Sequence, residues 1–596
     1  MSTLPANHGL LSEELQRRSS AFTKRRRAAE LWALLLAAGG ACQSANPPAL
    51  APASDVRHAP SVRSGFEPSV SLASATITEG FLRDRVDQLS ADEFEGRGPG
   101  TRGDLKARAY LEGQLASLGV TAGRGAQGWE QPIELVGLKA HLPSTWRFER
   151  GGRSVSLAWW DQYIAGSGVQ AAAGAIEQAE LVFVGYGIEA PEYDWNDFKG
   201  QSVKGKVLLV LNNDPDWDPA LFAGKTRLYY GRWPYKYESA ARHGAAGAII
   251  VHSTSSAGYP YQVVQSSWGG EQFALPSKGA TSLQVKAWVT EEAARSLVAL
   301  SGQSLEHLQE LAHSRAFTRV QLGIKTSLHF ENQVERVNTA NILGKIAGSD
   351  PELRDEYLVL SAHHDHLGIG KPDESGDAIY NGALDNGAGL AQVLAIVKAF
   401  QSLHTRPRRS ILVLFPGAEE AGLLGSEYFT EHLPIPAGKI TANLNYDGGN
   451  IWGRSRDITQ IGKGKSSIDV TVAQIAARLG RTIEGDQFPD LGTFYRSDQF
   501  NFAKIGVPAL YLKTGTNFIG RPANWGKEQI LAFEAKRYHQ PSDQLGPDWN
   551  FDGLVDDARF GFLAALEIAN ADHSPTWNPG DEFEAARRAA LDAIAR

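Results

Sequence analysis

Short apolar runs recur through the C-terminal half of the chain, and two of them lead into longer apolar stretches. Residues 357–361, 411–415 and 440–445 are mostly apolar runs of strand length, the pattern of strands buried on both faces. Residues 390–400 and 423–433 have helical length and follow loops after two of these runs. Strands that alternate with helices predict an α/β domain with a mixed, mostly parallel sheet flanked by helices.

Weaker signals extend this domain in both directions. Residues 338–346 have the pattern of an edge strand, and residues 507–512 form a further apolar run. The apolar segment 560–568 is expected to close the domain. Upstream, one helix is predicted to begin near Thr76 and a second is predicted over residues 106–118.

The region between residues 141 and 325 has a different texture. Its β-like runs are 181–184, 207–211, 248–251 and 284–289, and a helix is predicted over 237–242. The change predicts a β-rich unit inserted into the α/β domain. The domain limits are then 76–140 plus 326–572 for the α/β domain, 141–325 for the insertion and 573–596 for a C-terminal tail.

Length and composition are those of a globular protein with more than one domain. The chain has 596 residues, of which 42% are hydrophobic and 21% charged. Its formal net charge is −8, and outside the N-terminus its basic residues are scattered. This balance argues against a nucleic acid as the partner, because nucleic-acid binding needs a concentrated positive surface.

The N-terminus has the pattern of a targeting segment. Basic residues precede the apolar run 31–41, which is too short to span a membrane and has the length of a signal-peptide core. Cys42, the only cysteine, follows small residues and resembles a bacterial lipoprotein cleavage site. Residues 1–42 therefore predict export, either to the periplasm or to a membrane anchor through lipidated Cys42. Residues 43–75 are rich in Ala, Pro and Ser and predict a flexible linker.

Side chains suited to metal binding follow the predicted strands and loops of the α/β domain. They are His363, Asp385, Glu420, Asp447 and His539. Two imidazoles and three carboxylates suit two zinc ions if one carboxylate bridges them. Glu419, next to a ligand, is a candidate proton acceptor for an activated water. Because several strand ends contribute, the site is expected at the carboxyl edge of the sheet.

The first of these histidines has a distinctive neighbour. In an extended segment, residues two apart point the same way, so Asp365 is expected to orient groups around His363. His364 and His366 flank this pair and are not included among the ligands. Asp385 lies in a Gly-rich loop, which lets the backbone approach a bound ion closely.

These motifs, in this order, resemble the di-zinc aminopeptidase family that also contains glutamate carboxypeptidases and glutaminyl cyclases. The resemblance covers roughly residue 76 to residue 573, apart from the insertion. It implies a zinc exopeptidase fold in which Asp385 is shared by two zinc ions. The implied sets are His363, Asp385 and Asp447 for one ion and Asp385, Glu420 and His539 for the other.

The same resemblance implies the catalytic residues. Glu419 matches the general base, and Asp365 matches the carboxylate that supports the first histidine. Tyr495 is the candidate for the tyrosine on the substrate side, although its position relative to the following Ser-Asp pair is shifted by one. The peptide bond between Asp385 and Asn386 is expected to be cis. The insertion resembles the protease-associated domain carried by some members, and such a domain is expected to wall the cleft.

The function expected from this resemblance is hydrolysis of N-terminal residues from peptides through a metal-bridging water. A carboxypeptidase is the first alternative and would require converging arginines, for which Arg454, Arg456, Arg496 and Arg521 are available. A glutaminyl cyclase would need one zinc ion, and a non-catalytic receptor would lack the ligands. The donor set favours zinc, and cobalt or manganese fit the same donors. Residue preference and oligomeric state stay open.

Overall fold

The computed structural model describes residues 67–219, 221–279 and 282–595. The predicted targeting segment 1–42, with Cys42, and most of the predicted linker lie outside the described residues. The described chain begins with helix α2 (Pro68–Ala75), in which Ala73 is buried. The last part of segment 43–75, predicted as linker, is therefore helix, and the packed domain begins earlier than Thr76.

Four parallel strands form the centre of the sheet in the α/β domain. In order across the sheet they are β17 (Ser410–Phe415), β14 (Tyr357–Ser361), β18 (Ile440–Asn445) and β21 (Ala509–Thr514). Strand β13 (Val320–Ile346) pairs antiparallel with β17, and β19 (Asp457–Ile461) pairs antiparallel with β21. This confirms the predicted mixed, mostly parallel sheet.

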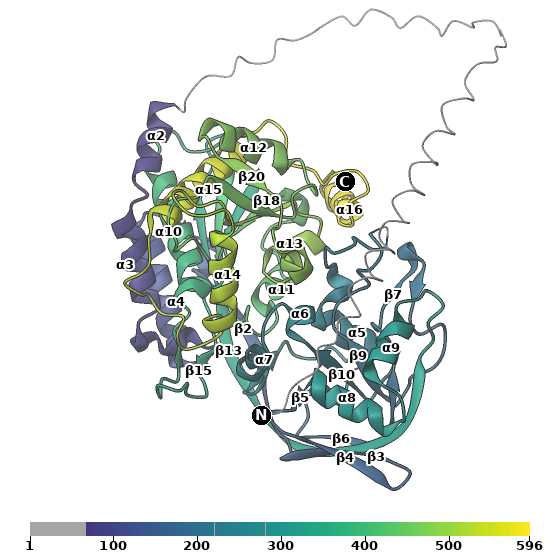
Figure 1. Cartoon of the computed structure of the whole chain (residues 1–596). Helices are drawn as coiled ribbons and strands as arrows, with labels where there is room; N and C mark the ends of the chain where they lie inside the picture. Colours follow the sequence, from purple (N-terminus) through teal and green to yellow (C-terminus); the bar gives the residue numbers. More distant parts are fainter. Residues whose placement is uncertain (1–66, 220, 280–281, 596) are drawn as a thin grey trace, which may run out of the picture. The chain divides into compact units, whose positions relative to one another are not determined.

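Helices cover both faces of this sheet, as the alternation within β14 shows. Leu358 and Leu360 belong to a core formed with α3 (Glu79–Leu89), α10 (Gly389–Gln401) and α15 (Asp552–Asn570). Tyr357 and Val359 point to the opposite face, against α11 (Leu424–Glu431) and α13 (Gln499–Lys504). Figure 1 shows α10 and α15 on one side of the sheet and α11 and α13 on the other. Both strand faces are buried, which explains the continuous apolar runs in the sequence.

Two long strands connect the α/β domain to the inserted unit. Strand β2 (Glu130–His141) pairs antiparallel with β13, from Glu130 opposite Ile342 to His141 opposite Glu331. Further along, β13 pairs with β6 (Ala173–Phe183) of the insertion. The predicted boundaries at residues 140 and 325 therefore lie next to or within continuous strands, and the predicted edge strand 338–346 is the end of β13.

The inserted unit has its own sheet and core. Its parallel strands are β9 (Val207–Leu211), β10 (Gly247–His252) and β12 (Val285–Thr290), close to the predicted runs. Helix α5 (Trp233–Arg242) begins four residues before its predicted start, with Pro234 in its first turn. Proline suits that position because the missing N–H would have no partner there. Helix α7 (Tyr261–Trp268) follows β10.

The C-terminal tail packs on the α/β domain. It contains helix α16 (Glu584–Ala595), and Trp577 and Phe583 are buried in one cluster with Tyr495. The Trp577 indole donates a hydrogen bond to the carbonyl of Gly506 at 2.9 Å. The tail is therefore part of the domain core. Among the described residues, no helix combines the length and the apolar character needed to cross a membrane.

Candidate metal centre

The five predicted ligands and Glu419 converge at one edge of the sheet. His363 follows β14, Glu419 and Glu420 follow β17, and Asp447 follows β18. Asp385 lies in the turn before α10, and His539 follows α14 (Trp525–Lys536). The carboxyl ends of parallel strands meet at this edge, so residues far apart in sequence become neighbours. The peptide bond between Asp385 and Asn386 is cis, as predicted.

Asp385 lies between the two histidines. Its Oδ1 is 3.3 Å from Nε2 of His363, and its Oδ2 is 3.3 Å from Nε2 of His539. Ligand bonds of about 2.0 Å at tetrahedral angles place two donor atoms about 3.3 Å apart. Nε2 of His539 is buried without a hydrogen bond, although an oxygen of Glu420 lies 3.0 Å away. These donors fit a carboxylate shared by two metal ions.

The remaining distances also divide the donor atoms into one set around His363 and one around His539, although some donors lie close to both sets. Asp447 Oδ1 is 3.7 Å from Nε2 of His363, whereas Glu420 Oε2 is 3.0 Å from Nε2 of His539. His363, Asp385 and Glu420 also have donor atoms within 4.8 Å of one another, as do His363, Glu419 and Asp447. The first triad mixes the two expected sets, and the second adds Glu419, which belongs to neither set, to two members of the first. The shorter pairwise distance assigns Glu420 to His539.

Both histidines present the same ring nitrogen to the centre. Nδ1 of His363 lies 3.2 Å from the backbone carbonyl oxygen of Asp365. Nδ1 of His539 lies 2.8 Å from the hydroxyl oxygen of Ser267, on α7 of the inserted unit. A hydrogen bond donated by Nδ1–H fixes the tautomer that leaves Nε2 free for a metal. The insertion thus orients one ligand, and no motif marks Ser267 in the sequence.

The carboxylate of Asp365 holds the turn that carries the two glutamates. It accepts hydrogen bonds from the backbone N–H groups of Glu419, at 3.0 Å, and Glu420, at 3.2 Å. Its Oδ1 is 3.8 Å from Nδ1 of His363, beyond hydrogen-bond distance. Asp365 therefore supports His363 through its backbone carbonyl group, and it supports Glu419 and Glu420 through its side-chain carboxylate.

The adjacent glutamates have opposite electrostatic surroundings. Burial raises the pKa of Glu419 well above its ordinary value, and the charges of Glu420 and Asp447 add to this effect. Burial also opposes ionisation of Glu420, but His539 and His366 outweigh it and lower its pKa to about 2. A site that separates the pKa values of two carboxyl groups assigns them different roles. In the metal-free protein Glu420 is therefore held ionised, as a metal ligand must be, whereas Glu419 is disposed to carry a proton.

Two buried side chains brace the loops around these ligands. Nδ1 of His366 lies 2.6 Å from Oε1 of Glu420, so a histidine left out of the ligand set positions a ligand. Arg97 is fully buried, and its guanidinium donates to the carbonyl groups of Leu89, His364, Asn381 and Gly382. Because three of these belong to the two metal-site loops, Arg97 ties the loops together.

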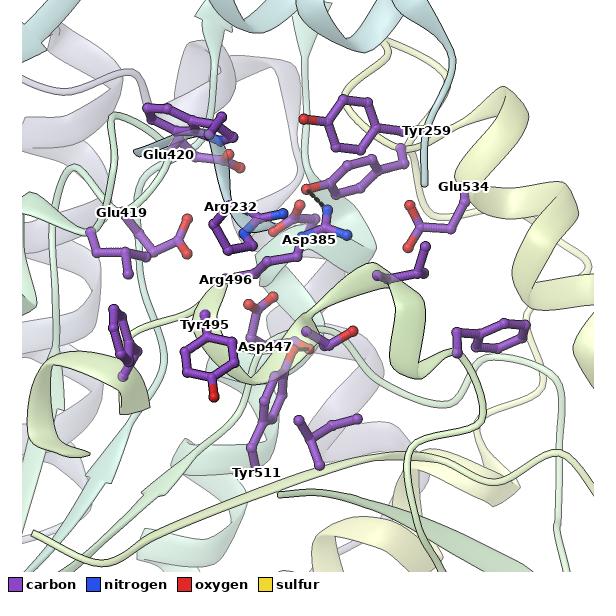
Figure 2. Close-up of a pocket in the computed structure, with 18 of the residues that line it drawn as sticks. Arg232, Tyr259, Asp385, Glu419, Glu420, Asp447, Tyr495, Arg496, Tyr511 and Glu534 are labelled. Carbon is purple, nitrogen blue, oxygen red and sulfur yellow. Dashed lines mark hydrogen bonds between the residues drawn. The ribbon is translucent and has the colours of Figure 1, made fainter. Parts of the chain in front are cut away.

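The tyrosines around the centre are arranged differently from the prediction. Tyr495 lines the cavity, but its hydroxyl donates to Glu582 of the C-terminal tail at 2.6 Å. Figure 2 shows this hydroxyl pointing away from Asp385. The hydroxyl of Tyr511 donates to the carbonyl of the ligand Asp447 at 3.1 Å. Tyr511 was not singled out in the sequence, where it is one residue of an apolar strand.

The metal-site residues open into a cavity of about 290 Å³. The α/β domain contributes Asp385, Glu419, Glu420, Asp447 and His539 to its lining, and the inserted unit contributes Tyr229, Arg232, Trp233, Tyr259 and Trp268. The insertion therefore walls the cavity, as expected. Its size is near the lower end for a small-molecule site, which suits a short segment of a ligand.

The arginines considered for a carboxypeptidase do not converge. Among Arg454, Arg456, Arg496 and Arg521, Arg496 alone lines the cavity. Arg454 lies 3.4 Å from Asp556, and Arg521 stacks on Trp525. These four residues therefore do not form the arginine cluster that the carboxypeptidase alternative would require.

Comparisons with known proteins agree with the geometry. Residues 341–558 match the model of Peptidase family M28. A probable leucine aminopeptidase 2 of Aspergillus oryzae is 28% identical over 259 residues, which is 42% of this chain and 48% of that protein. Leupeptin-inactivating enzyme 1 of Streptomyces exfoliatus is 28% identical over 209 residues, covering 34% and 43%. The chain thus spans about half the length of the curated relatives it matches.

Among solved structures, an aminopeptidase from Aneurinibacillus sp. strain AM-1 superposes with a TM-score of 0.50. The match covers 86% of this chain and 97% of that one at 17% sequence identity. This similarity shows a shared fold that extends beyond the matched family segment.

Proposed function

We propose that this chain, whose residues 341–558 form a Peptidase family M28 domain, is an exported di-zinc aminopeptidase. The observation that carries the proposal is the position of Asp385 between His363 and His539, with Glu419 beside them. The curated relatives named as aminopeptidases support the same class.

Zinc is the metal that the donor set fits. His363, Asp385 and Asp447 would hold one ion, and Asp385, Glu420 and His539 would hold the other. When bound, zinc polarises a carbonyl group and lowers the pKa of a water toward about 7. Burying several carboxylates at one point is costly without cations, which is a second reason for expecting metals here.

Glu419 is the proposed general base. Its carboxylate lies 4.0 Å from Nε2 of His363, and Asp365 fixes its backbone. It takes a proton from the attacking water and passes it to the departing amine. A donor role for Tyr495 stays a prediction and would require its hydroxyl to leave Glu582.

Particular residues argue against the alternative functions. Both histidines face Asp385, whereas a glutaminyl cyclase would need one zinc ion. A receptor without activity would have no use for Glu419 and the turn that Asp365 holds. A carboxypeptidase would recognise the substrate's C-terminal carboxylate, and Arg496 keeps that alternative open.

The remaining parts of the proposal concern the rest of the chain. The insertion 141–325 is proposed to be a protease-associated domain that restricts access to the cavity, supported by its wall residues. Export to the periplasm or to a lipid anchor at Cys42 rests on the sequence pattern of residues 1–42. Peptides are the proposed substrates.

The test is a pair of peptides of equal sequence, one with a free N-terminus and one N-acetylated. Zinc-loaded protein is incubated with each, with and without a chelator, and mass spectrometry follows which end is shortened. We expect chelator-sensitive loss of single N-terminal residues from the free peptide only. Shortening of the C-terminus, or of both peptides alike, would contradict the aminopeptidase assignment and favour a carboxypeptidase.

A further inference from the structure

The cavity beside the metal centre is lined by two arginines that form no ion pair with a carboxylate of the described residues. Arg232, at the start of α5 in the insertion, and Arg496, in the α/β domain, both line it. In the part of the chain that the structure describes, neither forms an ion pair within 4.0 Å. Figure 2 shows the two guanidinium groups near Asp385.

Arg232 is the more exceptional of the two. It is 7% exposed, its side chain makes no hydrogen bond, and its Nε is fully buried. Arg496 has partial compensation, because it donates to the Tyr538 hydroxyl at 3.1 Å and lies over the rings of Tyr259 and Tyr538. Isolated charge is expensive to bury, so Arg232 is unexplained by the folded chain alone.

The surroundings of Arg232 add like charge. Burial lowers the pKa of Arg232 to about 9, and the charges of Arg496 and Arg227 contribute to the shift. Arg227 is itself 1% exposed, with its Nε and one Nη lacking hydrogen bonds. All three remain cations at neutral pH. Arg227 and Arg232 are nearly fully buried, so this repulsion is screened less than it would be between groups in bulk water.

The acidic residues of the cavity compensate Arg496 in part but do not pair with Arg232. Glu534 lines the same cavity with its Oε2 buried and without a hydrogen bond, and its charge raises the pKa of Arg496, although the two groups form no ion pair within 4.0 Å. Glu238, Glu427 and Asp486 also line it without pairing with either arginine. The carboxylates nearest the centre are those assigned to the metals. An anion that is not part of the protein would therefore supply the missing ion-pair partner of Arg232.

We propose that Arg232 and Arg496 form a subsite for a carboxylate of the substrate, placed next to the scissile bond. Guanidinium groups bind carboxylates through paired, charge-assisted hydrogen bonds. The carboxylate belongs either to an acidic first residue or to the C-terminus of a dipeptide, since both bring it close to the metals. The inference rests on the proposed peptidase function and narrows its substrate class.

The experiment compares two pairs of peptides on the zinc-loaded full chain. The first pair is glutamyl-alanine amide and glutaminyl-alanine amide, and the second is leucyl-alanine and leucyl-alanine amide. We expect kcat/KM to favour the carboxylate member of one pair by roughly ten- to a hundredfold, the worth of a hydrogen bond to a charged group. The pair that shows the preference identifies which carboxylate is bound.

Variants then assign the preference to the subsite. Arg232→Met should abolish it, Arg232→Lys should retain part of it, and Arg147→Met serves as the matched control. Arg147 is an exposed arginine of the insertion that pairs with Glu149 and does not line the cavity. A wild-type enzyme without preference in either pair, or a preference that survives in Arg232→Met, overturns the proposal.

Binding separates failure of the subsite from failure of the peptidase. Calorimetry on zinc-loaded Glu419→Gln protein, alone and combined with Arg232→Met, measures affinity for the same four peptides without turnover. Tighter binding of a carboxylate member that disappears with Arg232→Met supports the subsite even if the wild type hydrolyses nothing, and only the peptidase proposal then fails. Equal binding within both pairs overturns the subsite even if hydrolysis is observed.

Discussion

The α/β domain and the inserted unit bring buried charge to one cavity in different ways. In the α/β domain, the carboxylates of Asp385 and Glu420 face the imidazoles of His363 and His539, in the geometry of metal ligands. In the insertion, Arg232 reaches the cavity without an ion pair or side-chain hydrogen bond to any described residue. The first arrangement would be completed by metal ions, and the second by a ligand that Arg232 shares with Arg496 of the α/β domain. The proposed chemistry therefore rests on the α/β domain, whereas the proposed selectivity needs both regions.

The two regions nevertheless meet at one of the predicted metal ligands. The Ser267 hydroxyl of α7 lies 2.8 Å from Nδ1 of His539, so the insertion contacts the metal centre through a ligand's far side. Long strands β2 and β13 connect the regions and extend this coupling into a shared sheet. Variants in each region test this difference between the α/β domain and the insertion.

The largest effect is expected for Asp385→Ala. This change removes a ligand that faces both histidines, so we expect loss of metal from both positions and loss of activity. Elemental analysis of dialysed protein measures zinc per chain. Asp373→Ala, in an exposed loop, is the matched control. If Asp385→Ala kept two zinc ions, Asp385 would not be the bridging ligand.

Glu419→Gln should separate chemistry from metal binding within the same domain. The substitution preserves shape but removes the proton acceptor, so turnover should fall by roughly 10² to 10⁴ while zinc content stays unchanged. Steady-state kinetics and elemental analysis measure the two quantities. Glu431→Gln, at the exposed end of α11 where Glu431 pairs with Lys278, is the control. Zinc loss or full turnover in Glu419→Gln would show that the base is another residue.

Three of the five predicted ligands could be placed from the sequence because they follow apolar strand runs. A strand such as β14 is buried on both faces, so the polar residue His363 directly after it must lie at the sheet edge. Neighbouring strands do the same for Glu420 and Asp447. Periodicity and strand ends therefore indicated the fold and the position of these three side chains, whereas Asp385 and His539 lie in loops and were singled out by residue type and by the family resemblance.

Contacts between separate surfaces had no comparable signal. Ser267 and Arg232 lie on helices of the insertion whose approach to the cavity depends on tertiary packing. The Tyr495 hydroxyl donates its hydrogen bond to Glu582, 87 residues further along the chain. The predicted insertion boundaries fall inside β2 and β13 because the alternating, half-exposed pattern of these connecting strands continues across both regions.

Ser267→Ala tests the coupling of the two regions. Without the hydroxyl, the ring of His539 loses the partner that fixes its tautomer, and we expect zinc affinity to fall by about 10- to 100-fold. Titration against zinc buffers measures the affinity. Ser266→Ala is the matched control, because Ser266 is adjacent on α7 and bonds only to helix carbonyls. Equal zinc affinities in the two variants would mean that the insertion lines the cavity without affecting metal binding.

The smallest effect is expected on the pH dependence of stability, and it follows from a contrast between two buried histidines. Burial opposes the charged form of His539, but Glu420 and Asp385 outweigh it and raise its pKa to about 10. In the insertion, burial lowers the pKa of His252 to about 4, with only carbonyl partners such as Tyr259 to oppose it. The same side chain is therefore favoured as a cation in one region of the metal-free protein and as a neutral ring in the other.

His252 should make the insertion sensitive to acid. Its folded pKa lies below the unfolded value of about 6.5, so its contribution to stability is complete above pH 6.5 and declines as pH falls toward 4. The difference amounts to about 3 kcal/mol at most. Thermal midpoints measured from pH 7 to 4.5 should fall less steeply for His252→Gln than for the wild type. His307→Gln, an exposed histidine of the same unit, should keep the wild-type slope. Parallel slopes for His252→Gln and wild type would mean that His252 is not held neutral and that acid sensitivity arises in the metal-binding region instead.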